Sequence, residues 1–347
     1  MGDSLRSDRP RILRAAAGPP DIEVRVPFVP QSQGATGITM HEIRVVTPYR
    51  LDLTVSALRR MATNPVDVYT EDGRYLRAFG HFAEPVIVSV SQLRADALAV
   101  SVMSRAADTE RALLVVRRML GTERDLSDFQ QHARAIRWLA PLARRMRGLK
   151  PPRYPTLFEA CANAIVFQQV SLQSASAIMR RLILALGSSV EFEGVPLAIF
   201  PGVETFLGAD DAVLLAAGLS GGKLATLRRA GEAIATGAMS EAMLGARSSV
   251  DAAHLLGDIK GIGPWTAAVI LLRGLGRLDV FPGGDSSVAA NLLLVAGERV
   301  DIGAALETLG SHRGMLYFCL LLARLEARGE IGRTSDVATR RSPRAGL

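Results

Sequence analysis

A glycine-centred turn between two apolar segments constrains this chain more than any other feature. Apolar residues lead up to Ile259, Gly261-Ile262-Gly263 form a tight turn, and Pro264 opens a second helix. Proline is favoured there because its missing N–H would have no partner in the first helical turn. Two glycines around one apolar residue let the backbone approach another molecule closely, and outward-facing amides at a helix start suit a phosphate. The pattern predicts a phosphate-binding helix-hairpin-helix over residues 250–274.

A single carboxylate follows this hairpin in a glycine-rich loop. Asp285 lies in the sequence Gly-Gly-Asp-Ser-Ser, shortly after Asp279-Val280-Phe281-Pro282. A hairpin that binds phosphate, followed by a lone loop carboxylate, indicates chemistry on a nucleic acid. Residues 279–288 therefore form a candidate catalytic loop.

Charge and composition agree with a polyanionic partner. The chain has 347 residues, of which 48% are hydrophobic and 22% charged, as is typical of globular proteins with two or three domains. Its formal net charge is +7, and only Lys150, Lys223 and Lys260 are lysines. Arginine binds phosphate oxygens bidentately, although such a bias can equally reflect genome composition. Between His132 and Tyr154 the charged residues are all basic, which favours a polyanion contact over an ordinary exposed face: Arg134, Arg137, Arg144, Arg145, Arg147, Lys150 and Arg153.

Cysteine and histidine usage gives no sign of a metal centre. Cys161 and Cys319 are the only cysteines and lie far apart, so they form neither a disulfide framework nor a zinc or iron–sulfur ligand set. The five histidines show no metal-ligand spacing either. No apolar run reaches the length of a membrane span, and no secretory leader is present. We expect a cytoplasmic protein with no membrane contact.

The pattern of apolar residues divides the chain into an α+β arrangement. Residues 1–30 predict a flexible arm, and residues 31–108 a small antiparallel β domain with alternating apolar positions over 43–53 and a β-branched run at 86–90. A short helix is expected at 55–61 and a hairpin turn at 71–74. Residues 109–330 predict a helical core in which strands no longer occur, with one helix over 125–146. Residues 331–347 predict a disordered basic tail.

The segment 156–186 predicts two helices separated by a pair of glutamines. Thr156 and Glu159 form a capping box at its start. Gln168 and Gln169 stand in apolar surroundings, where each side-chain amide needs several hydrogen-bond partners. They belong at a junction between helices, where one could enter a groove, or alternatively in a solvated turn. The stretch 218–223 lacks the spacing and the preceding strand of a phosphate loop.

These features together resemble the helix-hairpin-helix (HhH-GPD) DNA glycosylase superfamily, and most closely its 3-methyladenine DNA glycosylase II (AlkA-like) branch. The resemblance covers roughly residues 110–330. It is carried by ordered blocks at 158–171 (FEACANAIVFQQVS), 216–223 (AAGLSGGK), 259–267 (IKGIGPWTA), 279–288 (DVFPGGDSSV) and 313–322 (RGMLYFCLLL). It implies a small antiparallel β domain before a two-lobed helical glycosylase core. The implied enzyme hydrolyses N-glycosyl bonds of damaged bases in double-stranded DNA, in the nucleoid, and we expect it to act as a monomer.

The resemblance assigns roles to individual residues. Asp285 matches the catalytic aspartate, which stabilises positive charge on the sugar as the bond breaks. Gln169 matches the residue that fills the gap left by a flipped base, beside Gln168. The hairpin residues Lys260, Gly261, Ile262 and Gly263 match the DNA-binding turn. No cofactor is required, but backbone carbonyls of Gly257, Ile259 and Ile262 match a site for a monovalent cation.

Trp265 and its neighbours bear on the type of reaction and on the substrate. Relatives that also cleave the DNA backbone carry lysine at the position of Trp265, so the resemblance implies a monofunctional enzyme that leaves an abasic site. Trp265 would form a pocket wall with Val269, Tyr317 and Leu321, although a core tryptophan behind the hairpin is the alternative. This is a less aromatic lining than the branch usually has, which weakens cation–π selection. Alkylated purines such as 3-methyladenine and 7-methylguanine are the expected substrates. Deaminated or oxidised bases, or DNA binding without catalysis, remain alternatives.

Overall fold

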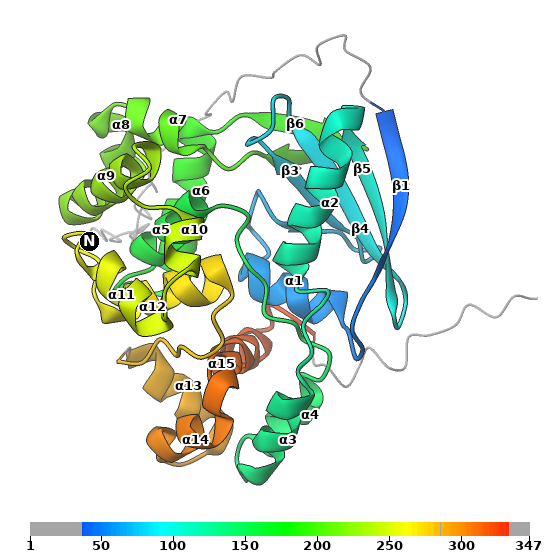
Figure 1. Cartoon of the computed structure of the whole chain (residues 1–347), viewed down its shortest axis with the longest axis vertical. Helices are drawn as coiled ribbons and strands as arrows, with labels where there is room; N and C mark the ends of the chain where they lie inside the picture. The colour runs from blue at the N-terminus through cyan, green and yellow to red at the C-terminus, as the bar shows by residue number, and fades with distance from the viewer. Residues whose placement is uncertain (1–36, 285, 333–347) are drawn as a thin grey trace, which may run out of the picture.

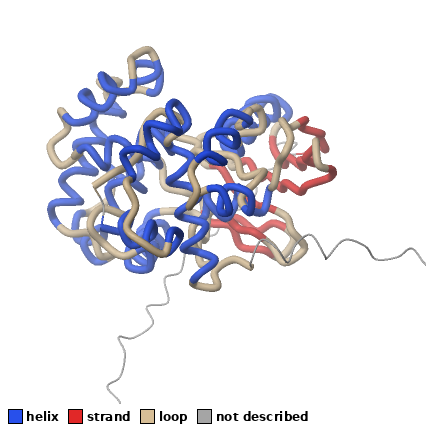
Figure 2. Tube along the Cα trace, turned by 90° about the horizontal axis from the view of Figure 1, so that it is seen from below, coloured by secondary structure: helices blue, strands red, loops and turns tan. Residues whose placement is uncertain are grey.

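The computed structural model describes residues 37–284 and 286–332, apart from the side chains of residues 286 and 287. Strands gather on one side of the molecule and helices on the other (Figure 1, Figure 2). The expected α+β fold class is therefore confirmed. The expected arm at 1–30 and most of the expected tail at 331–347 lie outside the described residues.

In the described part of the chain, the N-terminal unit is a five-stranded antiparallel sheet with strand order β1-β5-β4-β3-β2. The strands are β1 (Gly37–Arg44), β2 (Val68–Tyr69), β3 (Tyr75–Phe79), β4 (Val86–Arg94) and β5 (Ala97–Ser104). The predicted hairpin turn at 71–74 joins β2 to β3. The β-branched run at the start of β4 is buried, as expected for a strand that is paired on both edges.

Two helices belong to this sheet unit. Helix α1 (Leu51–Arg59) contains Leu51 and Leu53, so the strand pattern expected up to residue 53 is wrong at its end. Both leucines are buried, as is most of α1. A helix that is buried on nearly all sides has no single apolar stripe, so its residue pattern does not distinguish it from a strand. Helix α2 (Ala106–Leu120) places Leu113 and Val116 in the same core as the strands. The sheet unit thus extends to residue 120, past the expected boundary at 108.

The remaining described chain is mainly helical. The helix predicted over residues 125–146 is interrupted at residues 136–139. Near the end of the described chain, the helix that ends at Ala296 (α13) is followed by a further helix, α14 (Ile302–Leu309). The helices are α3 (Ser127–Ala135), α4 (Ala140–Arg145), α5 (Leu157–Val166), α6 (Leu172–Leu186), α7 (Val203–Gly208), α8 (Asp211–Ala216), α9 (Gly221–Ala235), α10 (Glu241–Gly245), α11 (Ser249–Gly257), α12 (Pro264–Ile270) with a π-helical extension (Leu271–Leu275), α13 (Ser286–Ala296), α14 (Ile302–Leu309), a 3-10 turn (Gly310–His312) and α15 (Gly314–Ala327). One hydrophobic core lies among α5, α6, α9, α11 and α12, and another among α3, α4, α14 and α15.

A short hairpin, β6 (Ser189–Phe192) and β7 (Val195–Ala198), contradicts the expectation that strands end before the helical core. Its two-residue turn, Glu193-Gly194, has positive φ at both positions, the geometry that tight hairpins require. Leu197 packs with Leu76 and Ile87 of the sheet. Strands of four residues are too short to show an alternating pattern of their own, so local residue patterns do not predict them.

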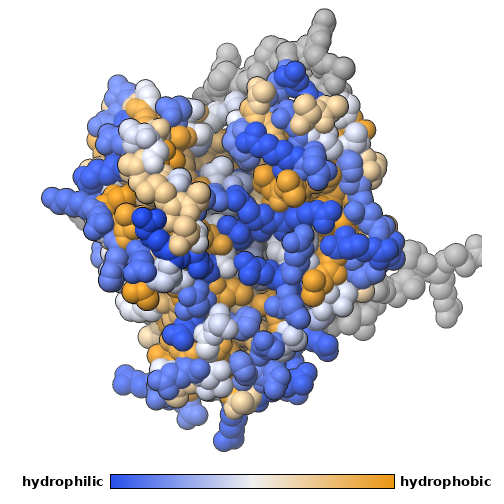
Figure 3. Space-filling model, in the orientation of Figure 1, coloured by the Kyte–Doolittle hydropathy of each residue, from blue (hydrophilic) through white to orange (hydrophobic). Residues whose placement is uncertain are grey.

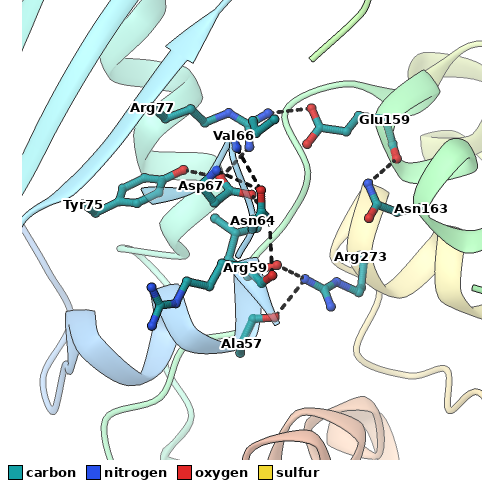
Figure 4. Close-up of polar contacts among 11 residues, drawn as sticks. Ala57, Arg59, Asn64, Val66, Asp67, Tyr75, Arg77, Glu159, Asn163 and Arg273 are labelled. Atoms are coloured by element: carbon teal, nitrogen blue, oxygen red, sulfur yellow. Dashed lines mark hydrogen bonds and ion pairs between the residues drawn. The ribbon is translucent and has the colours of Figure 1, made fainter. Parts of the chain in front are cut away.

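A buried ion cluster connects the sheet to the helical core (Figure 4). Arg77 on β3 donates to Asp67 Oδ1 and to Glu159 Oε2, each at 2.6 Å, and all three side chains are almost fully buried. The predicted cap of α5 is present, since Thr156 Oγ1 accepts from the Glu159 N–H at 3.2 Å. The Glu159 carboxylate, however, is turned toward Arg77. The second half of a capping box is therefore replaced by a contact between the two units.

Arg273 makes a second connection between the units. It lies in the π-helical extension of α12, is fully buried, and its Nη2 donates to the carbonyls of Ala57 and Leu58 at 2.9 Å. These carbonyls lie in the last turn of α1, where they have no partner within the helix. The guanidinium also stacks over the ring of Tyr154, with Cζ 4.7 Å from the ring centroid.

The arginine-rich run between His132 and Tyr154 divides into internal and exposed residues. Lys150 Nζ donates to the Arg124 carbonyl at 2.6 Å, and Arg153 donates to the Gly274 carbonyl. Arg145 pairs with Glu326 at 3.1 Å. The expectation of a continuous polyanion-binding run is therefore wrong for Lys150 and Arg153, because backbone carbonyls take their donors. The residues that are exposed are Arg134, Arg137, Arg144, Arg145 and Arg147, of which Arg145 is the one paired with Glu326.

Hydrophilic side chains predominate on the face toward the viewer in Figure 3, with small hydrophobic patches between them. Among the described residues, none of the helices combines the length and the apolar character that crossing a bilayer would take. Cys161 and Cys319 are buried free thiols, and burial raises the pKa of each to about 12.

Candidate active site

A cavity of about 1200 Å³ lies where the hairpin, the α5–α6 junction, α13 and α15 meet. Most residues that the sequence singled out line it: Gln168, Gln169, Gly261, Ile262, Gly263, Trp265, Tyr317 and Leu321. These residues come from segments far apart in the sequence, from Gln168 to Leu321, yet the fold brings them to one place. Lys260, Gly257 and Ile259 lie on the hairpin outside this lining.

Helix α9 packs against the hairpin and supports it. Ile262 is 5% exposed and packs in the core of α5, α9 and α12, so it anchors the turn. Arg229 Nε and Nη2 donate to the Lys260 carbonyl at 3.0 and 2.7 Å. Gly261 has φ +102°, and a Cβ at this position would overlap the hydroxyl oxygen of Thr226. Gly261 is therefore required by the fold itself.

Gly263 differs from Gly261, because no atom of the described chain would lie within 4 Å of a Cβ built on it. Its φ of −89° is open to any residue. Among the described residues, the backbone N–H groups of Gly261 and Gly263 donate no hydrogen bond. The described part of the fold gives no steric reason for a glycine at 263.

The two glutamines of the α5–α6 junction have different surroundings. Gln168 Nε2 donates to the Gly261 carbonyl at 3.0 Å and to Thr266 Oγ1 at 2.6 Å, so it joins the junction to the hairpin. Gln169 is exposed at the rim of the cavity and has φ +52°, which is uncommon and costly for a residue with a Cβ. Lys223 Nζ donates to the Val166 carbonyl at 2.8 Å and holds the end of α5 before this junction.

The pocket wall differs from the expected one at Val269. Trp265 is half-buried and lines the cavity, as do Tyr317 and Leu321. Val269 is 1% exposed and packs in the core, so the expectation that it lines the pocket is wrong. Only the first turn of α12 borders the cavity, and by Val269 the helix has entered the protein interior. Two unforeseen aromatic residues, Phe167 and Phe281, line the cavity in addition.

Arg60 is the main lining residue that sequence reasoning missed. It follows the last residue of α1, with φ +63°, and reaches the cavity from the sheet unit. Its Nη2 donates to the Tyr317 hydroxyl at 3.3 Å, and its Cζ lies 4.0 Å from the centroid of the Phe167 ring. Burial alone would raise the pKa of Tyr317, but the guanidinium groups of Arg60 and Arg273 outweigh burial and leave this pKa below its ordinary value.

Asp285, the predicted catalytic residue, lies outside the described residues. Gly284 and Val288, which flank its loop, both line the cavity. The role of Asp285 therefore stays a prediction, made for a loop whose two ends border the pocket. Phe281, in the same loop, contributes to the lining from the preceding side.

The hairpin carbonyls fit the expected cation site in part. Among the described residues, the carbonyls of Gly257 and Ile262 accept no hydrogen bond, whereas that of Ile259 accepts from the Ile262 N–H at 2.9 Å. Carbonyl oxygens are suitable ligands for a hard cation. No group of three or more histidine, cysteine or carboxylate side chains that could hold a metal occurs in the described part of the chain.

Two curated proteins are similar to this chain in sequence. The chain is 31% identical over 160 residues to a DNA-3-methyladenine glycosylase of Bacillus subtilis (strain 168), covering 46% of this chain and 53% of that relative. It is 27% identical over 259 residues to a probable bifunctional transcriptional activator/DNA repair enzyme AlkA of Mycobacterium tuberculosis (strain CDC 1551 / Oshkosh), covering 67% and 50%. The chain thus spans about half the length of these curated relatives. No family model matches the chain.

A solved structure shows the same fold. It is a 3-methyladenine DNA glycosylase from Archaeoglobus fulgidus, with a TM-score of 0.67 and 24% identity, covering 82% of this chain and 98% of that one. The likeness spans the sheet unit as well as the helical core. The order of elements, the hairpin beside the cavity and these relatives agree with the resemblance found in the sequence: the chain is similar to DNA-3-methyladenine glycosylases and to AlkA, and it shares the fold of the solved glycosylase.

Proposed function

We propose that this protein is a monofunctional DNA N-glycosylase that flips alkylated purines out of double-stranded DNA and hydrolyses their N-glycosyl bond. The observation that carries the proposal is the cavity bordered at once by the hairpin, by Gln169 and by both ends of the Asp285 loop. The curated relatives are named for 3-methyladenine glycosylase activity or DNA repair, which supports the same chemistry. We further propose that the protein acts as a monomer.

The proposed mechanism starts from the hairpin. The unpaired N–H groups of Gly261 and Gly263 would bind a phosphate beside the lesion, and the exposed Lys260 would add positive charge. Gln169 would fill the space in the helix that the flipped nucleotide leaves, which offsets a few kcal/mol of unstacking. A monovalent cation on the carbonyls of Gly257, Ile259 and Ile262 would stiffen the turn.

The bond-breaking step would depend on Asp285. Departure of the base leaves positive charge on the sugar, and a fixed carboxylate stabilises that charge until water adds to the anomeric carbon. N-alkylation makes the purine a good leaving group, so a single carboxylate suffices. Trp265, which borders the cavity, has no amine to form a Schiff base with the sugar. The product would be an abasic site with an intact backbone.

The proposal is tested by measuring release of free methylpurines from methylated duplex DNA. Asp285→Asn should abolish release while retaining affinity for DNA that carries an abasic site. Asp279→Asn, a matched change at an exposed residue of the same loop, should leave release near the wild-type rate. Borohydride should trap no covalent adduct. Unchanged release by Asp285→Asn would refute the catalytic assignment, and binding without release by the wild-type protein would favour a non-catalytic role.

A further inference from the structure

Four exposed arginines of the α3–α4 segment make no contact that the fold uses. This arginine patch consists of Arg134, Arg137, Arg144 and Arg147. In the described part of the chain, none of these four side chains takes part in a hydrogen bond, an ion pair or a ring contact, whereas the neighbouring Arg145 pairs with Glu326. The patch differs in this from Lys150 and Arg153, whose donors bind backbone carbonyls. Four guanidinium groups are thus left available to a partner.

The sequence around the patch contains no acidic side chain to balance its charge. Residues 129–149 include neither aspartate nor glutamate. Asp125 and Asp128 lie at the start of α3, whereas the patch begins in the last turn of this helix. The apolar residues of α3 and α4 pack in the core that these helices share with α14 and α15, so the arginines are on the solvent side. Exposed helix surfaces usually mix charges of both signs, so this all-basic surface indicates a polyanion as its partner.

The patch and the cavity lie on opposite sides of α15. Tyr317 and Leu321 of this helix line the cavity, whereas Glu326 contacts Arg145 of α4. With 3.6 residues per turn, Tyr317 and Glu326 point to opposite sides of the helix. Figure 1 accordingly shows α4 beside α15, at the same end of the molecule as α3 and α14. A duplex bound at the hairpin and the cavity therefore leaves the arginine patch uncovered.

We propose that the arginine patch binds the phosphate backbone of a second, undamaged DNA duplex while the cavity holds the damaged one. The choice of DNA as the polyanion rests on the function proposed above. Guanidinium groups bind phosphate oxygens bidentately, and contacts to phosphates are independent of sequence. Arg144 and Arg147 are one turn apart, with the Arg147 N–H donating to the Arg144 carbonyl at 3.2 Å, so both side chains can contact the same backbone. The second contact lets the protein pass between neighbouring DNA segments.

The experiment measures whether one protein holds two duplexes. An immobilised duplex with an abasic site is saturated with the full chain, and capture of a fluorescent undamaged duplex is followed over a range of salt concentrations. The patch variant combines Arg134→Gln, Arg137→Gln, Arg144→Gln and Arg147→Gln. It should bind the second duplex at least about tenfold more weakly than wild type does, and the slope of log affinity against log salt should fall by about 1 per lost phosphate contact.

A control variant separates the patch from net charge. It changes four exposed arginines of the sheet unit to glutamine: Arg44, Arg94, Arg105 and Arg111. Its net charge equals that of the patch variant, yet it should capture the second duplex as wild type does. Both variants should release methylpurines from a damaged duplex at the wild-type rate, which shows that they fold. A variant with Arg144→Gln and Arg147→Gln alone replaces the patch variant if that protein does not fold, and should show about half of its loss of slope.

The outcomes distinguish this inference from the proposed function. No capture by the wild-type protein, or equal capture by wild type and the patch variant, would overturn the inference and leave the glycosylase intact. Equal losses in the patch and control variants would overturn it as well, because net charge alone would then explain the binding. Capture of labelled polyglutamate in place of the duplex would overturn DNA as the partner and indicate an acidic protein. Normal capture without any release of methylpurines would overturn the proposed function instead.

Discussion

The side-chain amide of Gln168 donates to the backbone carbonyl of Gly261, at 3.0 Å, across 93 positions of sequence. This bond fixes the α5–α6 junction to the hairpin turn. The exposed Gln169 is therefore held at a set distance from the hairpin by its own neighbour. Under the proposed function, the phosphate contact and the insertion of Gln169 into the duplex would be coupled through this single amide.

Gln168→Ala should weaken binding to abasic-site DNA by about tenfold, because two hydrogen bonds of roughly 1 kcal/mol each position the junction against the hairpin. Fluorescence anisotropy with a labelled duplex measures the affinity. Gln173→Ala, at an exposed position of α6, is the matched control and should bind as wild type does. Equal affinities for the two variants would show that the junction needs no such connection.

The two hairpin glycines should respond differently to the same substitution. Gly261→Ala should lower the free energy of unfolding by about 1–3 kcal/mol, because its φ is +102° and its Cβ would overlap Thr226. Gly263→Ala should leave thermal stability unchanged but weaken DNA binding, because its Cβ would lie in open space where a phosphate is expected. Calorimetry and anisotropy together separate the two effects. Full DNA affinity in Gly263→Ala would contradict a phosphate contact there.

Removal of the buried cation of the ion cluster should destabilise the fold strongly. Arg77→Met leaves Asp67 and Glu159 buried without their partner, which costs about 3–5 kcal/mol. Arg74→Met, in the turn before β3, breaks solvent-exposed pairs with Asp72 and Glu193 and should cost less than about 1 kcal/mol. Denaturant unfolding followed by circular dichroism measures both changes. Similar losses in the two variants would mean that the cluster is not a special contributor to stability.

His81 should make the protein sensitive to mild acid. Burial, assisted by Arg77, Arg111 and Arg118, lowers the pKa of His81 to about 4, below its ordinary value of 6.5. The unfolded chain therefore takes up this proton first, so stability is unaffected above pH 6.5 and falls as the pH drops from 6.5 toward 4. Between pH 6.5 and pH 4, the free energy of unfolding of His81→Phe should therefore fall by roughly 1–3 kcal/mol less than that of the wild-type protein. A slope identical to that of wild type would place the acid sensitivity elsewhere.

Local signals predicted the part of the site that local chemistry controls. The Gly-Ile-Gly turn, the Thr156 cap and the paired glutamines each have a physical requirement that is visible within a few residues. Val269 was misplaced because helical spacing from Trp265 predicts a shared face, whereas only the first turn of α12 borders the cavity. Which turns of a helix border a cavity depends on tertiary packing, and the spacing of residues along the helix does not reveal it.

Arg60, Lys150 and Arg153 show a second limit. Each side chain has a partner far away in sequence: the Tyr317 hydroxyl for Arg60, and backbone carbonyls of residues 124 and 274 for the other two. A backbone carbonyl exists at every residue, so no pattern of residue types indicates which arginine will be used internally. For the same reason, the spacing of residues in the sheet unit did not indicate a site there, although Arg60 of this unit lines the cavity.

Arg273 and Arg77 have a consequence for dissecting the protein. Each arginine donates hydrogen bonds to the unit to which it does not itself belong. Arg273 donates to backbone carbonyls of α1, and Arg77 donates to the Glu159 carboxylate of α5. A fragment that began at residue 109 would carry Arg273 and Glu159 in its interior with neither partner supplied. We therefore expect the helical lobes alone to be destabilised, so that a minimal version of this protein should retain the strands that precede them.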